Sequence, residues 1–238
     1  MLSSKKNSRI LIKLSGESLM GAGNYGISID TVNNIATNLK KLLHKKTQIC
    51  VVIGGGNIFR GLEASSQGMD RANADYMGML ATVLNGLALQ NALEKIDTQT
   101  RVMSAFPIQS ICETYIRRRA IRHMEKNRIV ICTAGTGNPY FSTDTSAALR
   151  AAELDCGVIY KATQVDGIYD KDPKKFKNAK KYSKLSFKKY INENLKVMDT
   201  SAIAISRDNK IPIKLFSIQE KNCFVKMFMN KLSHSEIS

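Results

Sequence analysis

Short apolar segments rich in β-branched residues alternate along the chain with longer segments in which apolar residues recur at helical spacing. The first kind predicts buried strands, and the second predicts helices. Strands are expected at 10–14, 48–53, 101–105, 129–133, 157–162, 211–216 and 224–228, and helices at 72–94, 111–125, 143–153, 199–207 and after Asp30, with a stripe that runs to Lys46. This alternation implies an α/β fold in which helices cover both faces of a mostly parallel sheet.

Four loops that follow predicted strands contain the residues typical of a phosphate site. They span 13–17, 54–60, 135–144 and 163–172, and together they supply glycines, a lysine, an arginine and several aspartates. Ligands of an open parallel sheet bind beyond the carboxyl ends of its strands, so these loops are expected to meet at one edge. Backbone N–H groups and cations suit phosphates, and carboxylates suit Mg²⁺. Because no GxxxxGK[ST] motif occurs, the pattern predicts a kinase without a P-loop.

Two of these loops carry the strongest signals. Three consecutive glycines, 54–56, impose a large entropic cost on folding, so they indicate a close approach of the backbone to a phosphate-sized ligand, with Arg60 as a fork for its oxygens. Residues 136–144 lie between an apolar strand and an Ala-rich helix, whose first turn offers unpaired N–H groups and carries Asp144. We predict that this second segment is the active-site loop.

Composition narrows the class of protein. Lys and Arg number 36 against 20 Asp and Glu, a net charge of +16, which we interpret as a solvated basic surface rather than a nucleic-acid site. Five cysteines without a CxxC pair favour a reduced, cytoplasmic protein, and three scattered histidines offer no zinc site. The polar, basic first residues predict no signal peptide. Polar residues interrupt the uncharged stretch 76–93, so we expect a helix in the core or in a subunit interface rather than a membrane span.

Six ordered motifs point to one family. They are KLSGE at 13–17, GGGNIFRG at 54–61, DYMGMLATVLNGLA from Asp75, AGTGNPYFSTD at 134–144, KATQVDGIYDKDP at 161–173 and KVMD at 196–199. Together they resemble the bacterial UMP kinases, a branch of the amino acid kinase family, over almost the whole chain. The resemblance implies ATP-dependent conversion of UMP to UDP in cytoplasmic pyrimidine synthesis. It also implies a three-layer αβα sandwich assembled as a homohexamer.

The same resemblance assigns the sites. It implies one domain over 1–238, with UMP bound mainly by the N-terminal part and ATP mainly by the part from about residue 155. Mg²⁺ is expected with ATP, with no metal ligand assigned to the protein. Catalytic roles fall on Lys13, Arg60 and Asp144. The expected ATP site is Lys13, Leu14, Ser15, Gly16, Gly56, Arg60, Thr163, Tyr169 and Asp172. The expected UMP site is Gly55, Asp75, Thr136, Gly137, Asn138, Pro139, Tyr140, Phe141, Ser142 and Thr143.

Three positions depart from the patterns of relatives. Ser201 stands where the wider family often carries a second lysine, and the bacterial UMP kinases share this absence, so we expect Mg²⁺ to supply that charge. GTP activation and UTP inhibition are the regulation that the resemblance suggests. Gln90 and Glu94 stand where GTP-activated relatives carry Arg and His, and we therefore expect GTP activation to be weak or absent.

Two other functions fit parts of the sequence. A kinase of the same superfamily that acts on a carboxylate, such as that of aspartate or acetylglutamate, gains nothing from Asp75, which suits the hydroxyls of a ribose. A UMP-sensing or nucleic-acid-binding regulator would show salt-dependent retention of DNA instead of turnover. For the UMP kinase, we expect Asp144 to orient the metal or Lys13 rather than to act as a general base, because the acceptor phosphate already carries the attacking lone pair.

Overall fold

The computed structural model describes residues 9–171, 173 and 175–238, and its centre is a sheet. Within these residues nine strands form this sheet in the order β4-β3-β5-β2-β1-β6-β10-β11-β9. Neighbouring strands run parallel except for β10 and β11, which are antiparallel. Their bounds are β1 Arg9–Leu14, β2 Gln48–Ile53, β3 Thr100–Ser104, β4 Glu113–Thr114, β5 Ile129–Thr133, β6 Val158–Thr163, β9 Lys184–Leu185, β10 Ile213–Ser217 and β11 Ser235–Ile237. A separate pair joins β7 Ile168–Tyr169 to β8 Lys181–Tyr182.

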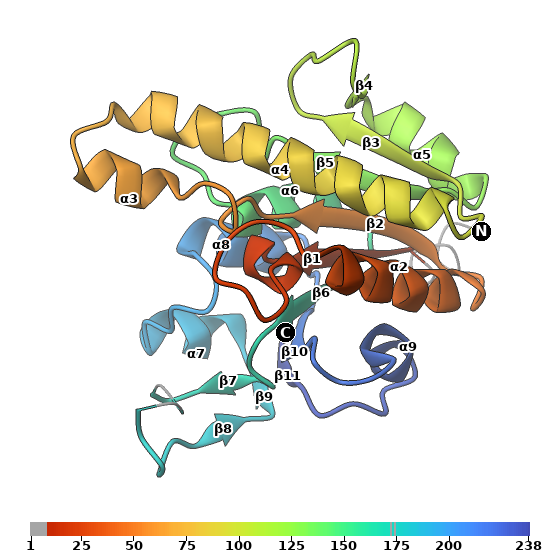
Figure 1. Ribbon diagram of the computed structural model, residues 1–238. Helices are drawn as coiled ribbons and strands as arrows, with labels where there is room; N and C mark the ends of the chain where they lie inside the picture. The colour runs from red at the N-terminus through yellow and green to blue at the C-terminus, as the bar shows by residue number, and fades with distance from the viewer. Residues whose placement is uncertain (1–8, 172, 174) are drawn as a thin grey trace.

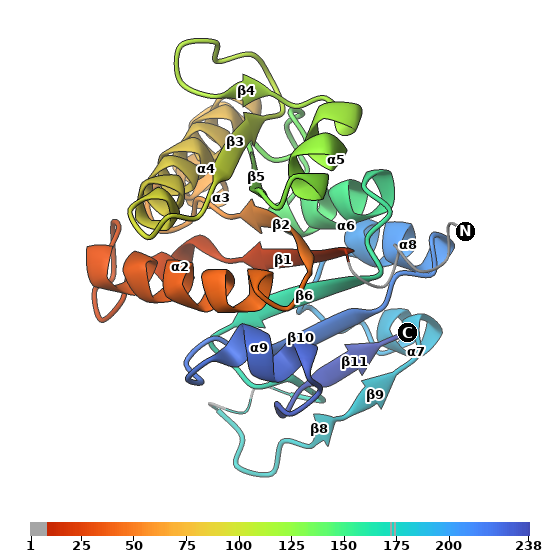
Figure 2. The same ribbon diagram turned by 90° about the vertical axis from the view of Figure 1, so that its right-hand side faces the viewer.

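Helices cover both faces of the sheet (Figures 1 and 2), which confirms the predicted α/β fold with three αβα layers. On one face lie α2 Ile29–Leu43, α4 Arg71–Glu94 and α9 Cys223–Phe228. On the other lie α5 Arg117–Glu125, α6 Thr143–Glu153, α7 Phe187–Asn192 and α8 Thr200–Asp208. The short helix α3 Gly61–Ser66 packs against α4, and a 3₁₀ turn, η1 Gly16–Leu19, follows β1. Each face of the sheet buries its own apolar core, because parallel strands covered on both sides have no solvent-facing surface.

Local sequence explains where several helices begin. The side chains of Ser28, Asp70, Ser142, Ser186 and Asp199 each accept a hydrogen bond from a backbone N–H in the first turn of the helix that follows. Such caps satisfy donors that have no partner inside the helix. The two caps at Ser142 and Asp199 matter most here, because they fix the starts of α6 and α8 at the same edge of the sheet.

One predicted helix begins too early, and one predicted strand is wrong. The predicted helix over 111–125 begins only at Arg117, because residues 113–114 pair with β3 as the edge strand β4. The predicted last strand over 224–228 is the helix α9, in which Phe224 and Met227 point at helical spacing into the core beside Phe216. A five-residue segment with four apolar residues does not distinguish a helical from a strand period, so tertiary packing decides its conformation. The last strand is instead β11, which pairs with β10.

Two smaller expectations also change. The stripe assigned to the second helix does not reach Lys46, because α2 ends at Leu43 and Lys46 has a positive φ of 59°. The composition of the Lys-rich segment 174–189 favours a solvated loop. In its described part, however, this segment contributes β8, β9 and the start of α7. Among the described residues, no helix is long and apolar enough to cross a membrane.

The strand order places the predicted loops along one edge. β2, β1 and β6 are neighbours, with β5 beyond β2 and β10 beyond β6. These five strands are parallel, so their carboxyl ends meet at the same side of the sheet. The edge therefore collects the loops that follow Leu14, Ile53, Thr133, Thr163 and Ser217.

Candidate active site

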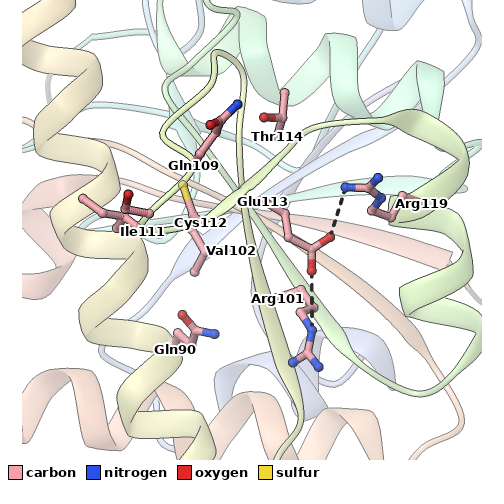
Figure 3. A pocket seen from close by; sticks show the side chains of 10 residues that line it. Gln90, Arg101, Val102, Gln109, Ile111, Cys112, Glu113, Thr114 and Arg119 are labelled. Carbon is pink, nitrogen blue, oxygen red and sulfur yellow. Dashed lines mark ion pairs between the residues drawn. The ribbon is translucent and has the colours of Figure 1, made fainter.

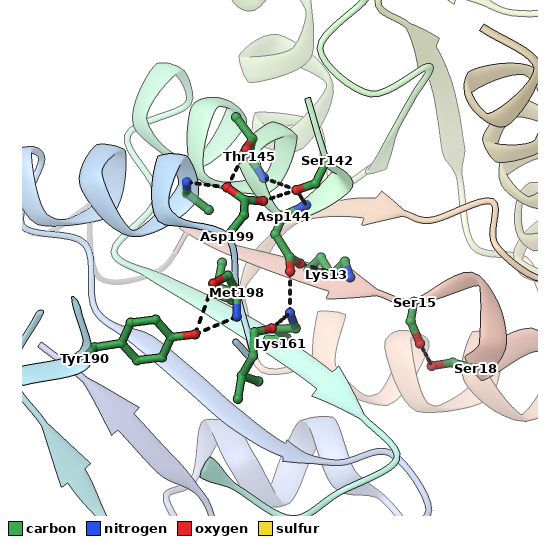
Figure 4. A network of polar contacts seen from close by, with 12 residues as sticks. Lys13, Ser15, Ser18, Ser142, Asp144, Thr145, Lys161, Tyr190, Met198 and Asp199 are labelled. Carbon is green, nitrogen blue, oxygen red and sulfur yellow. Dashed lines mark hydrogen bonds and ion pairs between the residues drawn. The ribbon is translucent and has the colours of Figure 1, made fainter. Parts of the chain in front are cut away.

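Two lysines and one aspartate form a buried charge cluster at this edge (Figure 4). Lys13 on β1 and Lys161 on β6 are cross-strand partners in the parallel register, so their side chains leave the sheet on the same face. Asp144, in the first turn of α6, lies between them. Its Oδ1 is 2.9 Å from the Lys13 ammonium, and its Oδ2 is 2.5 Å from the Lys161 ammonium. The three side chains are 9%, 8% and 13% exposed, so water screens these charges poorly.

The cluster keeps Asp144 ionised. Burial alone would raise the pKa of its carboxyl, but the charges of Lys13 and Lys161 outweigh burial and hold that pKa below its usual range. Burial, opposed by the charge of Asp144 and aided by repulsion from Lys13, lowers the pKa of Lys161 to about 8. At neutral pH the cluster therefore carries one net positive charge. Asp144 Oδ1 meets Lys13 as an ion pair without the alignment of a hydrogen bond.

Asp199 joins the starts of α6 and α8. Its carboxylate accepts hydrogen bonds from the backbone N–H of Ala202 at 2.8 Å and from the hydroxyl of Thr145 at 2.8 Å. It also accepts one from the Ser142 hydroxyl. The Ser142 hydroxyl oxygen in turn accepts from the backbone N–H of Asp144 at 3.0 Å. Asp199 thus holds the first turn of α6, and with it Asp144, in place.

A cleft of about 580 Å³ lies beside the buried cluster, and paired acidic and basic side chains line it. Asp75 on α4 accepts hydrogen bonds from the backbone N–H of Tyr140 at 2.7 Å and from Arg71 at 2.9 Å. Among the described residues, none accepts a hydrogen bond from the backbone N–H of Gly55 or Gly56, so these donors are free for a ligand. The Arg60 side chain is 45% exposed and pairs with Glu17 at 2.8 Å. Such an exposed pair exchanges easily for a phosphate.

The structure brings most of the predicted UMP residues into this cleft, but not all. Gly55, Asp75 and residues 140–143 line it, together with Gly56 and Arg60. Residues 136–139 do not line it. In that segment the Thr136 hydroxyl donates to the Asn138 carbonyl at 3.1 Å and accepts from the Asn138 N–H at 3.2 Å. These four residues shape the loop that delivers Tyr140 to the cleft.

A second cleft of about 600 Å³ lies beyond the ends of β6 and β10. It is lined by Gln164, Asp166, Tyr169 and Ser217, among others. The Tyr169 hydroxyl donates to Asp166 at 2.7 Å, and the Thr163 hydroxyl donates to the Val165 carbonyl at 3.0 Å, which closes the turn after β6. Of the predicted ATP residues, Tyr169 lines this cleft and Thr163 adjoins it. Asp172 lies outside the described residues.

Two of the other predicted ATP residues, Gly56 and Arg60, line the first cleft and not the second. The last four, 13–16, lie at the end of β1 and directly after it, between the strands that lead to the two clefts. The Leu14 side chain is fully buried in the core, so only its backbone can face a ligand. Gly16 packs so closely that a Cβ there would lie 2.7 Å from the backbone nitrogen of Gly56, which indicates that the β1 and β2 loops meet. Along this edge of the sheet, Lys13 therefore lies between the first cleft and the second cleft.

Two residues of the site were missed from the sequence. Lys161 and Asp199 lie in the KATQVDGIYDKDP and KVMD motifs, but neither had a role assigned. A signal for Lys161 was present, because a lysine inside a strand expected to be buried on both faces is unusual unless it is paired. For Asp199 the signal was its position at the start of a predicted helix, which is typical of a cap.

Comparisons with known proteins agree on one family. The sequence profile of the amino acid kinase family matches residues 8–217. The chain is 52% identical over 237 residues to the uridylate kinase of Rickettsia bellii, covering 100% of this chain and 99% of that relative. It is 54% identical over 226 residues to the uridylate kinase of Paramagnetospirillum magneticum, covering 95% and 94%. Among solved structures, the UMP kinase from Ureaplasma parvum superposes with a TM-score of 0.92 at 39% identity, covering 97% of this chain and 98% of that one. The UMP kinase from Bacillus anthracis gives 0.93 at 35% identity, covering 97% and 96%.

Proposed function

The chain belongs to the amino acid kinase family, and we propose that it transfers the γ-phosphoryl group of ATP to UMP, giving UDP and ADP. One observation carries this assignment: the first cleft places a carboxylate, Asp75, in the same cavity as the free amides of Gly55 and Gly56 and the Arg60 side chain. A ribose needs an acceptor for its hydroxyls, and a nucleotide phosphate needs N–H donors and a cation. A nucleoside monophosphate satisfies both ends of the cleft, whereas an acidic amino acid leaves Asp75 opposed to a carboxylate.

We assign the second cleft, beside Tyr169 and Thr163, to ATP. The strand order supports this, because Lys13 lies near the carboxyl end of β1, between the two clefts, where a phosphoryl group would pass from one to the other. The first cleft is lined by residues up to 145 with Asp199 and Ser201 added, and the second by residues from 164 onward. The proposed division is therefore N-terminal for UMP and C-terminal for ATP, with Asp199 and Ser201 at the start of α8 contributing to the UMP cleft.

The proposed chemistry rests on charge stabilisation rather than proton removal. The second pKa of a phosphate monoester is near ~6, so the attacking oxygen of UMP is already deprotonated at neutral pH. Lys13 and Arg60 offset the charge that spreads over the transferring oxygens, and the glycine amides orient them. The structure favours the orienting role of Asp144, since the pKa of its carboxyl is lowered and its Oδ1 faces Lys13. A carboxylate with a lowered pKa is a poor general base.

Mg²⁺ belongs to this proposal as a partner of ATP. Among the described residues, no group of three His, Cys, Asp or Glu side chains could hold a metal, and both oxygens of Asp144 face ammonium groups. We propose that the phosphates of ATP and water hold this ion. When bound, the ion neutralises charge on the β- and γ-phosphates.

We also propose that the protein works in the cytoplasm as a homohexamer. Its five cysteines are all free, as in a reducing compartment. One face of α4 exposes Met77, Leu80 and Leu84, which are 43%, 50% and 53% accessible and follow helical spacing. A second copy of the chain is the expected cover for this face. Sedimentation of the purified protein measures its oligomeric state. Leu80→Lys should shift the population to smaller oligomers.

A coupled assay of ADP release tests the proposed function. With ATP and Mg²⁺, the enzyme should turn over UMP and leave aspartate and N-acetylglutamate unchanged. CMP and dUMP measure the selectivity for base and sugar. Turnover of an amino acid without UMP activity would replace this assignment with a carboxylate kinase. Retention of DNA that weakens steeply with salt, without any turnover, would favour a nucleic-acid-binding regulator.

A further inference from the structure

The charge cluster contains a feature that folding alone does not explain. Lys13 and Lys161 are Cα partners on neighbouring strands, and like charges at such positions oppose strand pairing. Burial adds a desolvation cost for each charge, and well-packed apolar residues in place of buried ion clusters are often neutral or stabilising. Because β1 and β6 are otherwise mostly apolar, a second lysine at this position indicates a role in the chemistry.

The two lysines are anchored differently (Figure 4). Lys161 binds Asp144 and also donates a hydrogen bond to the Val197 carbonyl. Lys13 has Asp144 as its one ion-pair partner among the described residues. An ammonium with two fixed acceptors has little freedom to move, whereas Lys13 is freer to follow a phosphoryl group.

The acceptor that anchors Lys161 is itself fixed. The buried hydroxyl of Tyr190 on α7 accepts a hydrogen bond from the Met198 N–H at 2.7 Å and donates one to the Met198 carbonyl at 3.1 Å. Asp199, the next residue, caps α8 and holds Ser142. The segment 197–199 is therefore held from both ends, and it presents the Val197 carbonyl to Lys161.

We propose that Lys161 is a positioning residue for phosphoryl transfer. Anchored on the Val197 carbonyl, it holds Asp144 through Oδ2 so that Oδ1 faces Lys13. It also keeps the net charge of the cluster positive, so that Asp144 does not cancel the charge that Lys13 offers to the phosphates. This inference rests on the proposed kinase function and assigns Lys161 a part in it.

Lys161→Met tests the proposal directly. The variant should fold, because the Lys13–Asp144 pair that remains is neutral. We expect kcat to fall about 100-fold, and KM for UMP to stay within about threefold because Lys161 does not line the UMP cleft. The matched control is Lys214→Met, which removes a lysine from β10 that pairs with Glu236 at 3.6 Å and should leave kcat unchanged.

The pH dependence of the rate distinguishes the proposed role of Lys161 from a purely structural one. The charged and titratable groups around Lys161 are Lys13 from β1, Asp144 from α6, Asp199 before α8 and Tyr190 from α7. Because the pKa of Lys161 is lowered to about 8, the wild-type rate should fall as the pH rises through that value. Lys161→Arg keeps its charge, so its residual rate should lack this alkaline limb.

Tyr190→Phe should lower kcat by about threefold, because it removes the hydroxyl that holds Met198 beside the Val197 carbonyl. The control is Tyr182→Phe, whose hydroxyl binds Glu193 on the surface, and it should leave kcat unchanged.

The outcomes separate this inference from the proposed function. If the wild-type protein does not phosphorylate UMP, the proposed function fails. If it does, and Lys161→Met retains kcat within about twofold, the positioning role is overturned. Should Lys161→Met fail to fold, Lys161→Arg decides: loss of the alkaline limb supports the proposal, and an unchanged limb contradicts it.

Discussion

Two carboxylates in this protein each gather several basic groups, and they differ mainly in burial. Asp144 lies between Lys13 and Lys161 with its side chain 13% exposed. Glu113 on β4 lies 3.6 Å from Arg101, 3.7 Å from Arg119 and 3.2 Å from His123, and its side chain is 31% exposed. The Glu113 cluster forms one wall of a third cavity, of about 500 Å³ (Figure 3).

The difference shows what burial does to similar sets of charges. Around Glu113, water and salt screen the pairs, which then contribute on the order of 0–1 kcal/mol each and rearrange readily. Around Asp144, poor screening gives each charge a large effect on its neighbours, as the lowered pKa values of Asp144 and Lys161 indicate. Only the buried cluster can therefore hold charge in a fixed geometry for a transition state.

The largest expected effect is that of Lys13→Ala. The proposed role of Lys13 is to stabilise charge on the moving phosphoryl group, so kcat/KM should fall about 1000-fold, or about 4 kcal/mol of transition-state stabilisation. The chain should stay folded, because the Lys161–Asp144 pair remains neutral. Steady-state kinetics and a thermal melt measure both quantities. A folded variant with near-normal turnover would remove Lys13 from the chemistry.

Asp144→Asn should lower kcat about 100-fold and destabilise the fold by about 3 kcal/mol, because two buried ammonium groups lose their partner. The acid limb of the pH profile should not move. A lowered folded pKa means that Asp144 stabilises the fold above its ordinary pKa and loses this effect only as the pH falls below that value. A limb near ~6 therefore belongs to the UMP phosphate. Disappearance of the limb in Asp144→Asn would instead identify Asp144 as a general base.

The sequence predicted the elements on which the buried cluster is built, but not the cluster. The helix 143–153 has the predicted bounds, and the strands predicted at 10–14 and 157–162 lie within one residue of β1 and β6. Lys13 and Asp144 were assigned from local motifs. Lys161 was not assigned, because its role depends on strand register and on the Val197 carbonyl, which are long-range properties.

The same limit explains the errors near Glu113. The apolar residues around 111–116 fit a helix locally, but the backbone of 113–114 completes hydrogen bonds with the exposed edge of β3. Pairing at a sheet edge depends on what the neighbouring strand leaves open, and single-sequence periodicity does not contain that information.

The Asp75 side chain is 15% exposed in the cleft, a value between those of Asp144 and Glu113. Replacing it should therefore have an intermediate effect on the kinetics. If it accepts hydrogen bonds from the ribose, loss of a hydroxyl leaves it partly unpaired, so kcat/KM for UMP should exceed that for dUMP by about 10-fold or more. Asp75→Ala should reduce this preference to near unity. Asp70→Ala, which removes a cap at the start of the same helix, is the control for effects on α4. Equal use of both nucleotides by the wild type would exclude the ribose role.

The smallest expected effect concerns the Glu113 cluster and the residues beside it. Added GTP should raise the rate of UMP phosphorylation less than about twofold. Gln90 and Glu94 occupy positions that carry Arg and His in GTP-activated relatives, and Gln90 donates to Glu94 at 3.1 Å. Arg101 already lies between Glu94 and Glu113. A GTP phosphate would have to displace these carboxylates and would be repelled by the charge of Glu94, so GTP binding should change the activity little.

The double variant Gln90→Arg with Glu94→His removes that charge and adds cations, and its rate should respond to GTP more than the wild-type rate. A several-fold increase of the wild-type rate with GTP would contradict the predicted weak activation. It would show that the effector displaces the exposed carboxylates, whose ion pairs are weak because water and salt screen them.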